Sequence, residues 1–416
     1  MLRRRSLFFY GLLAAPLSFA GLPLYLHAPD YYATELSVSL AALGTVLLLL
    51  RIVDAVQDPL IGWISDRFAR HRQSIVVAGG VLLMLGFWML FHPLDGQYLI
   101  WFAVSVFICS TGFSIVSINY QALGGLWRTS DAQRTRITGW REGVGLLGLL
   151  TAAAMPTVLM RWYSDADSFH IVSLMLLVLL IVAGVLFRFW WKQTELTELR
   201  AGSDESSWWD DFRRIWLDPW HRHFYPLFLL NSLSAAVPGV LVLFFIRDLL
   251  GAEQLGGLFL LLYFASGASA MVLWHGVAVR IGKYRAWLAS MVLAIVTFIG
   301  AFAMGPGDIV AFAIICVLSG TALGGDLALP PAILADKMNE AGTVRRASSL
   351  YAMMAFLSKA GLALATGLTL PALDFVGFVP GTAATGSTAL ALSIAYALVP
   401  CVLKAVCAVW IWRRFC

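Results

Sequence analysis

Two aspartates stand four residues apart in an otherwise apolar stretch of the chain, the run RIVDAVQDP at residues 51–59. At helical spacing Arg51, Asp54 and Asp58 share one face, whereas the valines of the run point elsewhere. Two carboxylates one turn apart, with the amide oxygen of Gln57 beside them, supply several hard oxygen ligands. This donor set suits a small cation such as Na⁺, or a transferable proton.

A purely structural role for these charges is the main alternative. Arg51 and Asp54 could form an ion pair that only stabilises helix packing. Such a pair cannot easily neutralise Asp58 as well, and each buried charge costs about 2.5–3.5 kcal/mol on insertion scales. The sequence therefore favours cation or proton coupling, more strongly for Asp58 than for Asp54.

The elements that position these residues are membrane-spanning helices. Of the 416 residues, 60% are hydrophobic and 13% are charged, and the mean hydropathy is +0.80, which excludes a soluble fold. About twelve apolar segments are long enough to cross a bilayer of roughly 30 Å. We place them near residues 7–27, 36–62, 73–92, 98–127, 138–160, 170–192, 223–247, 256–279, 284–305, 308–334, 347–372 and 388–412.

The distribution of basic residues predicts the orientation of these spans. Most of the 29 Lys and Arg lie in alternate loops that include the N-terminus, whereas the opposite loops hold Arg161 and Arg247. Both termini are therefore expected in the cytoplasm. The net charge of +5 follows from this bias and gives no reason to expect nucleic acid as a partner. The first span lacks a convincing cleavage site and is interpreted as a retained helix.

The spans divide into two halves of six. We expect an N-terminal half at residues 1–192, a cytoplasmic central loop at 193–222 and a C-terminal half at 223–416. A basic loop follows the second span, and a weaker relative follows the eighth, as a duplicated transporter predicts. The first loop reads GWISDRFARHR at residues 62–72. With its Gly, an Asp four residues on and a basic cluster, it resembles the signature of the major facilitator superfamily. It predicts a conformational latch made by Asp66, Arg67 and Arg70, and an ordinary basic loop is the alternative.

Several motifs together resemble the glycoside-pentoside-hexuronide:cation symporter family, whose best-known member is melibiose permease. The second span carries Arg51-x-x-Asp54-Ala55-x-x-Asp58-Pro59-x-x-Gly62. Further matches are NYQALG at 119–124, the basic residues that follow it, and GGDLALPPA at 324–332. They occur in the expected order over nearly the whole chain. The resemblance implies an all-α major facilitator fold of twelve helices in two pseudo-symmetric halves.

The resemblance also implies a site. Asp54, Gln57, Asp58 and Ser114 take the positions that bind the coupling cation, Na⁺ or H⁺, with no other metal or cofactor. Arg141, Lys359 and Tyr25 match the substrate side. The sugar-gripping carboxylates of the family align with Ser18 and Ser117, and its helix-four Trp aligns with Gln121. A pocket with Arg141 and Lys359 but without those carboxylates is expected to be net positive and to suit an anionic group.

The interpretation is a secondary symporter, with two alternatives. The expected substrate is a glycoside, uronide or other anionic sugar derivative, moved by alternating access through a monomer in the bacterial inner membrane, in contact with lipid. A sodium-dependent lysolipid carrier of the same fold is one alternative, and a membrane enzyme or assembly factor is the other. We find no nucleophile elbow, phosphate loop or His/Cys cluster for an enzyme. Lys404 is expected to snorkel to the interface, and Asp326, before two prolines, to interrupt its helix or cap the break.

Overall fold

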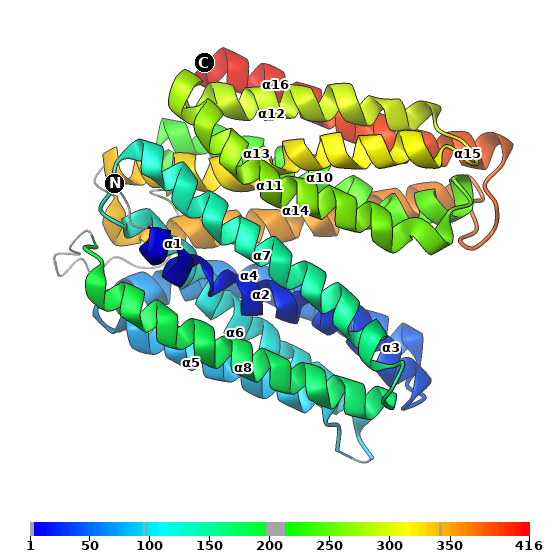
Figure 1. The fold of residues 1–416 in the computed structure, drawn as a ribbon, viewed down its shortest axis with the longest axis horizontal. Coiled ribbons are helices and arrows are strands. Elements are labelled where there is room, and N and C mark those ends of the chain that lie inside the picture. The colour runs from blue at the N-terminus through cyan, green and yellow to red at the C-terminus, as the bar shows by residue number, and fades with distance from the viewer. Residues whose placement is uncertain (1–3, 95, 197–212, 214, 341–342) are drawn as a thin grey trace. The chain divides into compact units, whose positions relative to one another are not determined.

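The computed structural model describes residues 4–94, 96–196, 213, 215–340 and 343–416. Within these ranges the chain is helical apart from turns, loops and one isolated bridge between Trp127 and Leu196 (Figure 1). Most of the predicted central loop lies outside the described residues. The prediction of an all-α membrane fold is confirmed, because helices satisfy their backbone hydrogen bonds internally in lipid.

The chain forms two compact units. Unit 1 contains residues 1–208 and 334–356, and unit 2 contains residues 209–333 and 357–416. The two halves predicted from the sequence differ from these units at one place, since residues 334–356 group with unit 1. The reason lies in hydrogen bonds from this segment to Asp66 and Arg134, which hydropathy does not reveal.

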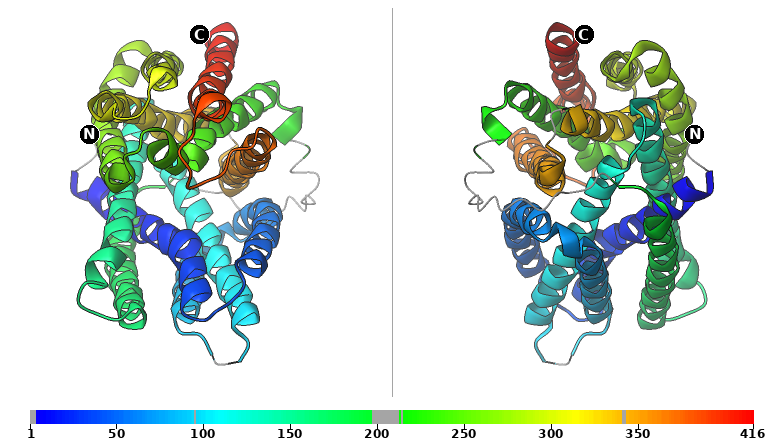
Figure 2. Two further views of the ribbon diagram at one scale, coloured as in Figure 1. Left: turned by 90° about the vertical axis from the view of Figure 1, so that its right-hand side faces the viewer. Right: turned by 90° about the vertical axis from the view of Figure 1, so that its left-hand side faces the viewer.

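Unit 1 is built mainly from long helices that run side by side, as the three ribbon views agree for α5 and α6 (Figures 1 and 2). Its elements before the segment at 334–356 are α1 (Arg4–Gly11), α2 (Ala14–Leu22), η1 (Pro23–His27), α3 (Ala28–Thr34), α4 (Leu40–Arg67), η2 (Ala69–His71), α5 (Arg72–Phe91), α6 (Tyr98–Leu126), α7 (Asp131–Leu159) and α8 (Asp165–Gln193).

Close approach of α5 and α6 depends on two glycines. A Cβ on Gly86 of α5 would collide with the backbone nitrogen of Cys109, and a Cβ on Gly112 of α6 would collide with the backbone nitrogen of Leu83. Small residues let helix backbones touch in lipid, where hydrophobic burial alone does not drive helices together. These contacts fix α6, which carries Ser114 of the candidate cation site.

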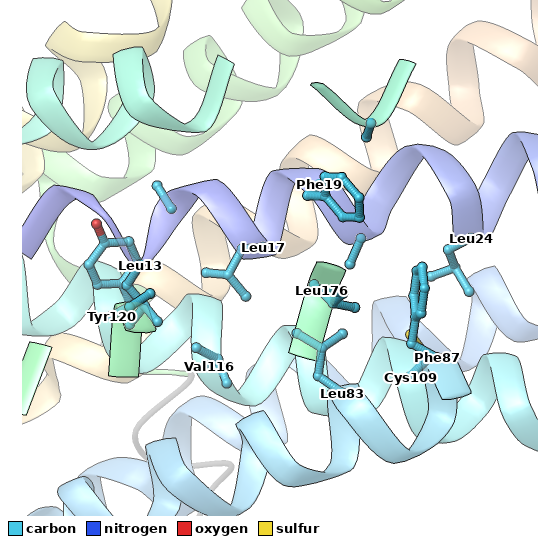
Figure 3. Close-up of a cluster of buried hydrophobic side chains, with 14 of the residues drawn as sticks. Leu13, Leu17, Phe19, Leu24, Leu83, Phe87, Cys109, Val116, Tyr120 and Leu176 are labelled. Carbon is cyan, nitrogen blue, oxygen red and sulfur yellow. The ribbon is translucent and has the colours of Figure 1, made fainter. Parts of the chain in front are cut away.

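A buried apolar cluster holds α2 against the rest of unit 1. Leu17 of α2 and Leu13, which directly precedes this helix, face side chains from α5, α6 and α8, among them Leu83, Val116 and Leu176 (Figure 3). All of these residues are at most 5% exposed. Burial on this scale keeps α2, α5, α6 and α8 in fixed register with one another.

Unit 2 has its own core and helices. Its elements, including the parts of α13 and α14 that extend into unit 1, are α10 (Pro219–Phe244), η3 (Phe245–Leu249), η4 (Glu253–Leu255), α11 (Gly256–Ile281), α12 (Lys283–Phe298), η5 (Ile299–Ala303), α13 (Ile309–Glu340), η6 (Val344–Arg346), α14 (Ala347–Phe375), α15 (Gly386–Ser393), η7 (Ile394–Leu398) and α16 (Val399–Phe415). Aromatic rings of Phe245, Phe259, Phe312 and Tyr396 form the centre of its core.

Nine of the described helices are long and apolar enough to cross a membrane. The other three predicted spans fall on α1 to α3, on α4 and on α7. The first is divided into short pieces, whereas α4 and α7 carry charged residues that lower their hydropathy. The count of twelve spans and the cytoplasmic position of both termini stay predictions.

Two expectations for the C-terminal half are wrong. Asp326 neither interrupts nor caps a broken helix, because α13 continues from Ile309 to Glu340 with Pro330 and Pro331 inside it. Lys404 does not snorkel, since it is 6% exposed and its ammonium group lies 2.5 Å from the carboxylate of Asp326. A nearby carboxylate holds the ammonium group in the interior, so the side chain has no need to reach the interface.

Candidate functional site

The acidic face of α4 is buried in the structure, as the helical spacing predicted. Asp54 is 4% exposed and Asp58 is 0% exposed, whereas Val53 and Val56 on the other side are 42% and 70% exposed. The helix runs through Pro59 without a break. Two carboxylates therefore lie one turn apart on the protein-facing side of a continuous helix, which is the arrangement a cation or proton site needs.

Gln57 connects this face to α6. Its side-chain nitrogen donates a short hydrogen bond to Asp54, and its side-chain oxygen accepts one from Thr111 at 3.1 Å. The amide therefore orients the carboxylate of Asp54 and offers its oxygen toward α6. Sequence reasoning missed Thr111, although it lies three residues before Ser114 and thus on the same face of α6.

A second hydrogen bond fixes the register of α4 on α6. Asn119 donates to the hydroxyl of Ser65 at 2.8 Å, and the two bonded pairs, Gln57–Thr111 and Ser65–Asn119, are both separated by 54 residues in the chain. Equal separation means that the two helices run parallel and in step. Asp58 on α4 and Ser114 on α6, which is 2% exposed, both fall between these two bonds.

The four predicted cation ligands are thus gathered within one short stretch of two parallel helices. Their groups are two carboxylates, an amide and a hydroxyl, and Thr111 adds a second hydroxyl. Hard oxygen donors of this kind suit Na⁺, and two neighbouring carboxylates also suit a shared proton. Within the described residues no group of three or more His, Cys, Asp or Glu is arranged to hold a metal ion.

The predicted substrate residues of unit 1 lie on α2, α6 and α7. Ser18 packs against α7, since a Cβ on Gly145 would lie 2.9 Å from its hydroxyl oxygen. Gln121 donates to the hydroxyl of Ser117 at 3.2 Å, so these two side chains already contact each other. Tyr25 lies in η1, and its side chain is outside the described part of the chain. Lys359 is half-buried on α14 in unit 2.

Arg141 is not the uncompensated positive charge that the sequence led us to expect. It is buried, and its guanidinium donates two hydrogen bonds to Glu142, at 2.5 and 2.8 Å. The side chain also lies close to Tyr10 and Tyr120. Because the neighbouring carboxylate neutralises it, Arg141 contributes no net charge to a substrate pocket in unit 1.

The predicted latch centres on Asp66 at the end of α4. Its carboxylate accepts hydrogen bonds from the backbone amides of Ser348 and Ser349, at 2.9 and 2.8 Å, and from the Ser349 hydroxyl at 2.8 Å. These amides belong to the first turn of α14, where backbone donors have no partner within the helix. Asp66 therefore caps α14 from another helix and complements its dipole.

The basic residue at this latch is Arg72, which lies 2.9 Å from Asp66 and is 1% exposed. The predicted members Arg67 and Arg70 are both exposed. Arg67 lies over the ring of Trp63 at 5.5 Å, and no ion pair of either arginine occurs among the described residues. A latch role for Arg67 and Arg70 stays a prediction, and the residue that follows the turn η2, Arg72, is the one that pairs with Asp66.

Two further contacts hold the segment at 334–356 within unit 1. Arg134 pairs with Asp336 at 2.8 Å, and Asn339 donates to the carbonyl of Gly125 at 3.1 Å. Close packing adds to them, since a Cβ on Gly62 would lie 2.6 Å from that of Ala352. Polar contacts and small residues therefore tie the ends of α13 and α14 to α4, α6 and α7.

Comparison with known proteins identifies the relatives of this arrangement. The family model described as MFS/sugar transport protein matches residues 7–415. The glucuronide carrier protein homolog of Escherichia coli (strain K12) is 24% identical over 92% of this chain and 86% of its own length. The inner membrane symporter YicJ of the same organism is 22% identical to this chain. The aligned region covers 56% of this chain and 52% of YicJ, about half of its length.

A solved structure shares the fold. The crystal structure of a bacterial homologue of the iron transporter ferroportin, in an outward-facing state, superposes with a TM-score of 0.75. The alignment covers 99% of both chains at 17% sequence identity. At this identity the likeness shows the fold alone.

Proposed function

Because this chain belongs to the MFS/sugar transport protein family, we propose that it is a symporter that couples a sugar-type substrate to the entry of Na⁺ or H⁺. As a member of that family it is a multi-pass membrane transporter and not an enzyme. The finer parts of the proposal are the coupling cation, the substrate class of glycosides and uronides, and a location in the bacterial inner membrane.

The acidic face of α4 is the observation that carries the proposal. Asp54 and Asp58 are buried, and Gln57 and Thr111 connect this face to α6. Two carboxylates one turn apart repel each other when both are charged, so a bound cation or proton stabilises the arrangement. A site made from two helices also changes when the helices move relative to each other, which gives the ion a preferred conformation.

Coupling follows from shared conformational preference. If the cation and the substrate each bind the same state more tightly than the other states, each raises the affinity for the other by the same factor. The latch at Asp66 supplies a two-state element, since its bonds to the first turn of α14 can break and remake as the transporter changes state. Names of related proteins, including a glucuronide carrier homolog and a symporter, support this class of activity.

The test is transport by Asp58→Asn in proteoliposomes. An amide keeps the size of the side chain but removes one carboxylate, so accumulation driven by a Na⁺ or H⁺ gradient should be abolished. Facilitated counterflow of the same substrate should remain measurable. Ser269→Ala is the matched control, because Ser269 is exposed on α11 and its hydroxyl bonds the carbonyl of Ala265 in the same helix. Full gradient response by Asp58→Asn would show that the assignment is wrong.

A further inference from the structure

Unit 2 contains a second cluster of charged and polar groups. The carboxylate of Asp326 on α13 accepts hydrogen bonds from Lys404 of α16 at 2.5 Å and from the indole of Trp287 of α12 at 3.0 Å. Asn231 of α10 accepts a hydrogen bond from Lys404 at 2.8 Å. Four helices of unit 2 therefore converge on one carboxylate.

Burying the Lys404–Asp326 ion pair costs more desolvation free energy than a purely structural contact would require. The side chains of Lys404 and Asp326 are 8% and 10% exposed, and both belong to helices with the length and hydropathy of membrane spans. A well-packed apolar pair is often as stable as a buried ion pair or more so. Ionisable residues within membrane spans usually belong to ligand or ion pathways. The cluster is therefore a candidate ligand site.

A cavity of about 420 Å³ adjoins the cluster and has both Asp326 and Lys404 in its wall. Its volume is in the range of small-molecule sites, roughly 300–1,000 Å³. Much of the remaining wall is aromatic, with the rings of Phe259, Tyr263, Phe298, Phe312 and Tyr396. The rings of Phe298 and Tyr396 contact each other at 5.1 Å between centroids, so this part of the wall is packed in place.

Hydrogen-bonding capacity remains in the cavity wall. An ammonium group has three donors, and Asn231 and Asp326 accept two of those of Lys404. The hydroxyls of Tyr263 and Tyr396 have no hydrogen-bond partner within the part of the chain that the structure describes, and Tyr396 is 3% exposed. The cavity thus combines ring faces with separate donors and acceptors.

The charges at this site select the class of ligand. Lys404 and Asp326 neutralise each other, so a charged ligand would leave one charge uncompensated in a medium of low polarity. A ligand that fits must be uncharged, must carry both donors and acceptors, and must present an apolar face to aromatic rings. A sugar ring has all three properties.

We propose that this cavity of unit 2 binds the uncharged sugar ring of a glycoside, with Asp326 accepting hydrogen bonds from its hydroxyls and Lys404 donating to them. The inference rests on the proposed function and narrows its substrate class. It also supplies an acceptor carboxylate in a chain that has Ser18 and Ser117 where the resembling family has its sugar-gripping carboxylates.

A cavity-filling variant tests the site without touching the ion pair. Gly239 of α10 lines the cavity, and a Cβ at this position would meet no atom within 4 Å, so Gly239→Leu places bulk in the cavity with little strain on the helix. Gly367→Leu is the matched control. Gly367 is exposed on α14, and a Cβ there also meets nothing within 4 Å.

Binding is measured by isothermal titration calorimetry on the purified full chain in detergent. The probes are the methyl glycosides of glucose, galactose and xylose, with glucuronate as the charged comparison and lysophosphatidylcholine as the lipid comparison. We expect a methyl glycoside to bind the parent and Gly367→Leu equally, and to bind Gly239→Leu at least about tenfold more weakly. Tyr263→Phe, which removes only a hydroxyl, should weaken binding by about three- to tenfold.

The outcomes separate this inference from the proposed function. If a methyl glycoside is bound and accumulated by the parent while Gly239→Leu and Tyr263→Phe behave like the parent, the cavity is not the site and the symport proposal stands. If glucuronate or lysophosphatidylcholine, but no methyl glycoside, depends on Gly239, the uncharged-sugar inference is overturned. If the parent binds none of the glycosides, the inference fails, while cation coupling is still tested by Asp58→Asn.

Discussion

The acidic face of α4 in unit 1 and the Asp326–Lys404 cluster in unit 2 use buried carboxylates in different ways. In unit 1 two carboxylates, Asp54 and Asp58, lie one turn apart with an amide and hydroxyls between α4 and α6. In unit 2 a single carboxylate has an ammonium group of the same chain at 2.5 Å. The second arrangement pairs its carboxylate with an ammonium group, whereas the first places two carboxylates side by side.

Charge within the membrane alone therefore does not identify a cation site. The number of carboxylates and the charge of their partners decide whether a site needs an ion from solution or offers hydrogen bonds to a neutral ligand. The two clusters therefore make separate predictions, in which a change to one should leave the property of the other unaltered.

The largest expected effect is on stability, in Lys404→Met. Removing the ammonium group leaves Asp326 buried without its counter-charge, which should destabilise unit 2 by about 3–5 kcal/mol. The double variant Lys404→Met with Asp326→Leu should recover much of this loss, since it removes both charges. Thermal unfolding in detergent measures the stability of the single and of the double variant. If the single variant is as stable as the parent, the two charges do not depend on each other.

The next largest effect concerns protection by the coupling cation. Sodium at about a hundredfold above its dissociation constant should stabilise the parent by about 2.7 kcal/mol, and Asp54→Asn should lose this protection. Asp326→Asn should keep the full increment, whatever its own baseline stability. The stabilisation by sodium is measured by comparing melting curves in NaCl with melting curves in choline chloride. Equal loss in both variants would remove the contrast between the two clusters. If sodium protects neither the parent nor the variants, the ion to test is the proton.

Asp66→Asn tests the latch. The variant weakens the cap on the first turn of α14 and the ion pair to Arg72. We expect the free energy that holds α4 against α14 to fall by about 1–3 kcal/mol. The expected result is faster labelling of a cysteine placed at Ser348 from the cytoplasmic side. Arg67→Gln is the matched control, because Arg67 is exposed and lies over Trp63. Identical labelling rates in both variants would contradict the latch.

The smallest effect is expected from Thr111→Val. This change removes one hydroxyl from the candidate cation site but keeps the side-chain shape, and it should cost about 0.5–1.5 kcal/mol in cation affinity. The sodium concentration for half-maximal transport should therefore rise several-fold. Thr321→Val is a suitable comparison, since Thr321 is a half-buried threonine of α13 whose hydroxyl bonds the carbonyl of Val317 in the same helix. No change in the sodium dependence of Thr111→Val would place Thr111 outside the site.

The all-helical membrane fold and the acidic face of α4 could both be predicted from the sequence. Hydropathy sets where helices cross a bilayer, and helical periodicity sets which side chains share a face. Both are local properties, so helical spacing alone was enough to identify Asp54 and Asp58 as buried neighbours. The family resemblance added Gln57 and Ser114 as candidate ligands, and the structure places Gln57 beside Asp54.

Which groups meet across helices could not be predicted in this way, because it depends on how distant segments pack. Local spacing cannot show that Thr111 bonds Gln57, that Arg72 rather than Arg67 reaches Asp66, or that Glu142 compensates Arg141. The same holds for Asp326 and Lys404, which are 78 residues apart. The cost of burying a charge depends on its partners in space, and those partners are brought together by packing between helices.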